Sequence, residues 1–156
     1  ADAMATLTQE LCGDGEIIVK FEGGSSIGWA GINMRETLDP ASKKVQMMQN
    51  GSFFGRREVR TMTNGFAFPQ QMFAFGKPWM RLVRNGDQFS GYISANGVNW
   101  QFVMTQLVSM ADCIEVGMVA TTINVNTTYT ATFSNVQVIQ TGDGLQAVPN
   151  TIAQSN

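Results

Sequence analysis

The chain has 156 residues, of which 44% are hydrophobic and only 14% charged, a length and composition typical of one globular domain and not of a disordered chain. Ten lysines and arginines against twelve acidic residues leave a net charge of −2, so there is no basic excess to bind nucleic acid. Histidine is absent, which excludes Ser-His and Cys-His nucleophile pairs and zinc held by imidazole.

The first half of the chain has the pattern of short strands divided by turns. Residues 16–22 are rich in β-branched and aromatic side chains and end at a Gly-Gly-Ser-Ser breaker. Residues 27–36 alternate between the two faces of a strand. Asn-Gly pairs, the signal for a tight hairpin, stand at 50–51 and 64–65. Two more strands are predicted between these signals, over residues 44–49 and 52–63.

The second half repeats this organisation. Asn-Gly pairs at 85–86 and 96–97 predict two further hairpins. The only helical pattern covers residues 105–111. Strands are predicted over residues 79–84, 88–94, 98–103, 114–122 and 129–139. Short strands with frequent turn signals predict an all-β fold, a two-sheet antiparallel β-sandwich of jelly-roll type.

The alternating pattern of the strands ends after residue 139, where the many small polar residues show no regular spacing. We therefore expect one β-sandwich over residues 1–139 and a linker or docked C-terminal tail over residues 140–156. No apolar run approaches the roughly 18 residues that would span a membrane.

The two cysteines, Cys12 and Cys113, leave two alternatives open. They could form a disulfide across a loop of about 100 residues, worth about 4–5 kcal/mol in the chain-entropy model. They could equally be two small buried hydrophobic residues. There is no C-x-x-C, so neither a redox motif nor a zinc knuckle is predicted.

Six segments resemble successive strands of concanavalin A-like lectin/glucanase domains, of the type appended to bacterial xylosidases and to other secreted bacterial proteins. They lie in the expected order between residues 6 and 138. The segments are residues 13–20, 28–37, 78–86, 89–100, 114–120 and 131–138. The resemblance implies a concanavalin A-like jelly roll, a fold that hosts lectins, enzymes and adhesive modules alike.

Two departures from the family pattern bear on assembly. Family domains begin with a further strand before residues 5–11. That strand is missing here, or residues 148–155 replace it. Residues 66–75 are also richer in aromatic side chains than the polar connection expected there. A missing strand would leave a sheet edge open to a segment from another copy.

Catalytic and metal sites have little support in the sequence. The glucanase branch of the family uses an E-x-D-x-x-E strand motif, and the chain has none. The oxygen-rich turns at Asp14 with Glu16 and at Asp143 are the only candidates for Ca²⁺, and none forms a dense calcium loop. We predict no catalytic residue, no metal site and no cofactor, with calcium as the weak alternative.

A ligand site is predicted on the strand face opposite the core. By alternation Asn33 and Arg35 lie on that face of one strand, and Arg81 and Tyr92 lie on it in two others. The resemblance implies that these strands share the concave sheet, where the four side chains would converge. Planar polar groups beside an aromatic ring suit a sugar. The alternative is a solvated sheet face held by cross-strand pairs.

An interface is predicted in the aromatic run that follows residue 65. Its members are Phe66, Phe68, Phe73, Phe75 and Trp79. They are either strand ends that face the core or an exposed edge that binds a partner, including another copy of the chain.

The combined hypothesis is a non-catalytic extracellular recognition or adhesion module from a bacterial secreted or surface protein. Its expected partner is a glycan or cell-surface polymer, and neither nucleic acid nor a membrane span is expected. The alternative is a self-assembling structural subunit of a filament or surface layer. A glycoside hydrolase accessory domain comes third.

Overall fold

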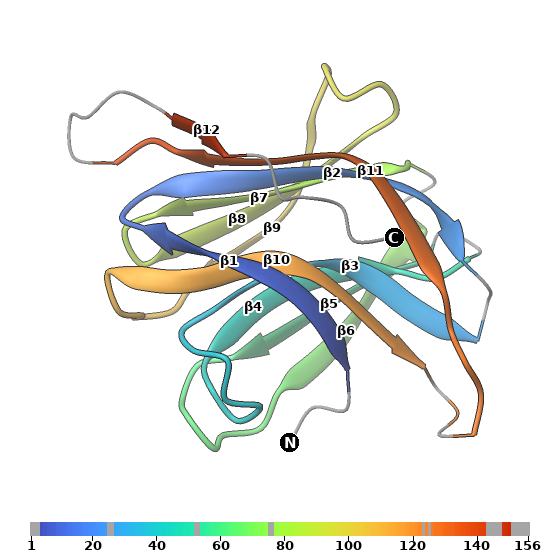
Figure 1. Ribbon diagram of the computed structural model, residues 1–156, viewed down its shortest axis with the longest axis horizontal. Coiled ribbons are helices and arrows are strands. Elements are labelled where there is room, and N and C mark those ends of the chain that lie inside the picture. Colours follow the sequence, from blue (N-terminus) through green and yellow to red (C-terminus); the bar gives the residue numbers. More distant parts are fainter. Residues whose placement is uncertain are drawn as a thin grey trace.

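The computed structural model describes residues 4–24, 27–51, 54–74, 77–122, 124, 126–142 and 148–150, with backbone alone for 71–74 and 148–150. Two antiparallel sheets of six strands each lie face to face, one above the other in Figure 1. The described part of the chain contains no α-helix, and so none that could cross a membrane. The predicted all-β sandwich is confirmed.

The lower sheet of Figure 1 has the strand order β1-β10-β3-β4-β5-β6. Its strands are β1 (Ala5–Cys12), β10 (Cys113–Thr122), β3 (Gly28–Arg35), β4 (Lys44–Gln49), β5 (Phe54–Arg60) and β6 (Phe68–Ala74). The upper sheet has the order β12-β11-β2-β7-β8-β9. Its strands are β12 (Val148–Asn150), β11 (Ala131–Gln140), β2 (Gly15–Gly24), β7 (Trp79–Asn85), β8 (Gln88–Ser94) and β9 (Gln101–Leu107).

The core lies between the facing sides of the two sheets. Ile32 and Met34 on β3 and Met80 and Leu82 on β7 are fully buried in it. Each large apolar side chain buried in this way contributes about 1.5–3 kcal/mol. Arg81, between the two core residues of β7, lies on the opposite face, as the alternation predicts. The side chains that remain for function are therefore those on the outer faces of the sheets.

The predicted helix over residues 105–111 is wrong. Residues 105–107 complete β9, and the remaining residues have no helical structure. A helix of two turns is marginal without tertiary support, whereas Thr105 and Leu107 gain ladder partners in β8. Pairing with the neighbouring strand outweighs the local pattern.

The first and the last described strands each form an edge of one sheet. β1 forms one edge of the lower sheet by pairing with β10. In the tail, residues Val148–Asn150 add the short strand β12 to β11 of the same chain. Residues Val148–Asn150 therefore supply a strand to their own sandwich.

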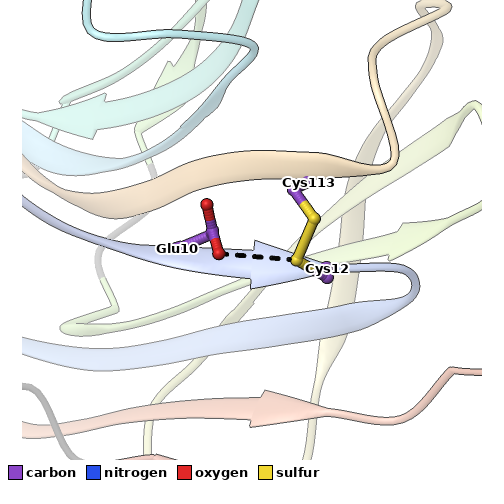
Figure 2. Close-up of side chains that lie close together, drawn as sticks. All are labelled: Glu10, Cys12 and Cys113. Atoms are coloured by element: carbon purple, nitrogen blue, oxygen red, sulfur yellow. Dashed lines mark hydrogen bonds between the residues drawn. A yellow bond between two sulfur atoms is a disulfide. The ribbon is translucent and has the colours of Figure 1, made fainter.

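The two cysteines are joined in a disulfide between the ends of β1 and β10. They are direct partners in the ladder, with Cα atoms 3.9 Å apart. Figure 2 shows the bridge beside the Glu10 carboxylate, whose Oε1 lies 3.6 Å from Cys12 Sγ. A bridged sulfur carries no proton, so this is a contact and not a hydrogen bond.

Candidate functional site

The four predicted ligand residues do not converge. Asn33 and Arg35 lie on β3 in the lower sheet, whereas Arg81 and Tyr92 lie on β7 and β8 in the upper sheet. The expectation that these strands share one sheet is wrong. Alternation assigns each side chain to a face, but the sheet to which a strand belongs depends on long-range pairing.

Arg35 is engaged by the loop that follows β3. Its side chain is buried, Nε donates to the Thr37 carbonyl at 2.9 Å, and Nη2 donates to the Asp39 carbonyl at 2.7 Å. Arg60 holds the same region in the same way, with Nη1 donating to the Pro40 carbonyl at 2.8 Å. The two guanidinium groups thus fix the backbone of the loop that follows β3.

Asn33 begins a row of buried polar side chains across the lower sheet. It faces Gln46 on β4, which faces Glu58 on β5. Asn33 and Gln46 are fully buried, and among the residues that the structure describes neither the Asn33 amide atoms nor Gln46 Oε1 has a hydrogen-bond partner. Glu58 binds Lys44 Nζ at 2.6 Å and Arg56 Nη2 at 2.5 Å. Because solvent does not reach this row, it presents no open binding surface.

Two opposing effects act on the Glu58 carboxyl group. Burial pushes its pKa upward, while hydrogen bonds and charge from Lys44 and Arg56 push it downward. The two cations prevail, so the pKa lies below its ordinary value of 4.5. Glu58 is therefore an ionised partner of two basic groups.

The outer face of the upper sheet brings together Arg81, Tyr92 and two aromatic residues that the sequence analysis missed. The Arg81 guanidinium lies 5.4 Å from the centre of the Tyr92 ring and 5.7 Å from that of Trp100. Phe102 meets the Tyr92 ring edge-on, with ring centres 5.9 Å apart. Arg81 also forms an ion pair with Glu16. We call Arg81, Tyr92, Trp100 and Phe102 the aromatic platform.

Strand register builds the platform. Arg81 on β7 faces Tyr92 on β8, and Tyr92 faces Phe102 on β9. A shift of register between Gly91 and Tyr92 brings Phe102 onto the outer face. The alternation of β7 and β8 is the one sequence pattern that points to this arrangement. The bulge between Gly91 and Tyr92 has no sequence signature of its own.

Hydrogen bonds within the loop between β8 and β9 order the backbone that leads to Trp100. Ser94 Oγ accepts a hydrogen bond from Gly97 N–H at 2.9 Å, and Asn96 Oδ1 accepts two more, from Val98 and Asn99. Gly97 has a φ of 75°, a conformation that glycine adopts without strain. The platform is therefore preorganised by its own backbone.

The platform combines ring surface with oriented charge. Phe102 is 56% exposed, and the rings of Tyr92 and Trp100 are partly exposed. The ion pair with Glu16 orients the Arg81 guanidinium, which lies over both the Tyr92 and the Trp100 rings. Apolar ring faces with a fixed hydrogen-bond donor and a carboxylate acceptor match the C–H faces and hydroxyl groups of a pyranose.

Of the predicted interface residues, those whose side chains the structure describes lie in two different sheets. Phe66 and Phe68 are 84% and 71% exposed at the β5–β6 end of the lower sheet. Trp79 belongs to the upper sheet, where it is half-buried and its ring lies over Gly97. Phe75 and the side chain of Phe73 lie outside the described residues. Leu38 and Met62, at 60% and 68% exposed, are further apolar side chains of the lower-sheet loops.

The turns considered for calcium have other partners. Asp14 Oδ1 accepts from Gly86 N–H at 2.7 Å, and Glu16 binds Arg81. Asp143 lies outside the described residues. In the part of the chain that the structure describes, the one cluster of potential metal ligands is Glu10 with Cys12 and Cys113. Its sulfurs are bonded to each other (Figure 2), so they offer no thiolate to a metal.

Comparisons with known proteins identify the fold. Neither a protein-family model nor a curated protein matches the chain. Similar solved structures include a functionally unknown protein from Saccharomyces cerevisiae, with a TM-score of 0.70 and 18% identity over 91% of this chain and 77% of that one. A Bacillus licheniformis β-glucanase has a TM-score of 0.55 and 11% identity over 89% and 70%. A β-1,3-1,4-glucanase from a mouse hindgut metagenome has a TM-score of 0.57 and 8% identity over 86% and 69%. The chain thus shares the jelly-roll fold of β-glucanases.

Proposed function

We propose that this chain is a non-catalytic glycan-recognition module that binds a polysaccharide through the aromatic platform. The observation that carries the proposal is the placement of the Arg81 guanidinium over the Tyr92 and Trp100 rings, with the exposed Phe102 packed against Tyr92. Rings on a sheet face offer a flat contact to a sugar chain, and the Arg81–Glu16 pair supplies both a donor and an acceptor.

Two features fit a recognition module rather than an enzyme, and a third fits a module that works outside the cytoplasm. The sequence has no E-x-D-x-x-E motif. The buried Glu58 is engaged by Lys44 and Arg56, so it is poorly suited to donate a proton. The disulfide fits an oxidising compartment, as expected for a secreted or surface protein.

The alternative proposal is a self-assembling subunit, and one observation favours it. Four apolar side chains, which we call the loop patch, are 60–84% exposed at one end of the lower sheet: Leu38, Met62, Phe66 and Phe68. The loops beneath are fixed by Arg35 and Arg60 through bonds to backbone carbonyls. Rigid loops with exposed apolar side chains are typical of a partner surface.

The glycan proposal is tested by affinity electrophoresis in gels that contain mixed-linkage β-glucan, laminarin or xylan. We expect at least one polysaccharide to retard the wild-type protein. Tyr92→Ala and Arg81→Ala are each expected to weaken that binding by about 10-fold, because each removes about 1–2 kcal/mol of stacking or polar contact.

Phe68→Ala is the control, since it removes an exposed aromatic ring from the other sheet. It should bind like the wild type. Retention of full affinity by both platform variants, with melting temperatures unchanged, would move the site away from the upper sheet.

A further inference from the structure

The strand at the edge of the upper sheet, β9, has backbone groups available for a partner. Among the strands that the structure describes, β9 pairs only with β8. Val108 N–H donates to the Asp87 carbonyl at 2.9 Å, so these two residues form a hydrogen-bonded pair. In the same register, Leu107 faces Gln88 and Thr105 faces Ser90. Hydrogen-bonded and non-hydrogen-bonded pairs alternate in an antiparallel ladder. The backbone N–H and C=O groups of Thr105 and Leu107 therefore point away from β8.

The other described sheet edges carry features that oppose the addition of a strand, and β9 carries none of them. β1 has the exposed carboxylate of Glu10, and β6 contains Pro69, which has no N–H to donate. β12 has only three residues and contains Pro149. The sequence of β9, Gln-Phe-Val-Met-Thr-Gln-Leu, has neither a charge nor a proline. Its Leu107 side chain is 75% exposed.

We propose that β9 pairs antiparallel with β9 of a second copy of this chain, which joins two upper sheets across a two-fold axis. A free strand edge is complementary to an extended chain, and an uncharged strand can pair with itself without repulsion. The charges at the two ends of β9 favour antiparallel over parallel pairing. Lys77 Nζ donates to Gln101 Oε1 at 2.6 Å where β9 begins, and the exposed Asp87 lies beside Val108 where β9 ends.

Antiparallel pairing brings the Lys77 end of one copy toward the Asp87 end of the other. Parallel pairing would place like charges together. The contact also continues the outer face that carries Phe102, so the dimer would display two aromatic platforms on one extended sheet. The dimer itself does not depend on glycan binding, and its failure would leave the proposed function unaffected.

The oligomeric state of the full chain tests the inference, measured by sedimentation equilibrium from low micromolar to millimolar concentration. We expect a reversible monomer–dimer equilibrium for the wild type. Leu107→Lys introduces a charge near Lys77 of the other copy and should weaken the dimer at least 10-fold. The matched control, Phe68→Lys, places the same charge at a similarly exposed apolar position on β6 and should leave the dimer intact.

Hydrogen exchange of the wild type gives a second readout that needs no variant. The amides of Thr105 and Leu107 should become protected as protein concentration rises, while those of the β1 edge should not. A wild type that stays monomeric at every concentration would overturn the inference. So would a dimer that Phe68→Lys abolishes and Leu107→Lys does not, a result that would assign the interface to the loop patch.

Discussion

Glu58→Gln is expected to lower the free energy of unfolding by about 3–5 kcal/mol, because it removes the carboxylate from a buried ion pair and leaves the ammonium buried. The Lys44 side chain is fully buried and that of Glu58 is 7% exposed, with Nζ and Oε1 2.6 Å apart. Urea denaturation measured at neutral pH gives the change directly.

A double variant separates the ion pair from general packing. Lys44→Met combined with Glu58→Gln removes both charges and keeps both side-chain volumes close to the original, so most of the lost stability should return. If the double variant is as unstable as the sum of the two single variants, the two residues act independently and the interpretation of the pair is wrong.

The same pair gives the protein a defined acid sensitivity. In the folded state the pKa of Glu58 lies below its ordinary value of 4.5, so the pair stabilises the fold fully at pH values above that value. This contribution is lost as the pH falls through the lower, folded-state pKa. Below pH 4.5 the wild type should therefore lose stability more steeply than Glu58→Gln in a series of denaturation curves.

Removal of the disulfide, by Cys12→Ser together with Cys113→Ser, is expected to cost about 4–5 kcal/mol in the chain-entropy model. The bridge spans a sequence separation of 101 residues, so the unfolded chain gains much freedom when it is cut. Urea denaturation of the variant and of the reduced wild type should give equal losses.

A matched measurement in reductant distinguishes the bridge from side-chain packing. Reductant should lower the stability of the wild type and leave the double-serine variant unchanged. An unchanged wild type in reductant, with both thiols shown by alkylation to be free, would contradict the assignment of the stability to the bridge.

Much of the fold could be predicted from local sequence. The Asn-Gly pair at 85–86 marks the hairpin between β7 and β8, in which Asn85 faces Gln88 and Gly86 has a φ of 62°. Alternation correctly assigned Met80 and Leu82 to the core and Arg81 to the opposite face. These features depend on backbone chirality and a period of two, which are properties of a few consecutive residues.

The site could be predicted only in part, because it depends on contacts between distant segments. Arg81 and Tyr92 meet because β7 and β8 form a hairpin, which is a local feature. Asn33 was placed beside them wrongly, since β3 pairs with β10 and β4 in the other sheet. Phe102 reaches the platform through a register shift that no sequence pattern predicts. Sheet membership and bulges are decided by packing across the whole domain.

The most direct test of the glycan account uses the three tryptophans, because they report on both outer faces. Trp79 and Trp100 lie with the upper sheet, whereas Trp29 lies on the outer face of the lower sheet, 5.5 Å from the Arg56 guanidinium. Their three indole N–H resonances, assigned with single Trp→Phe variants, can be followed while an oligosaccharide of the retarding polysaccharide is added. The account predicts that the Trp100 resonance shifts with saturation while that of Trp29 stays in place. A saturating shift of Trp29 with Trp100 unmoved would contradict it and assign glycan binding to the lower sheet.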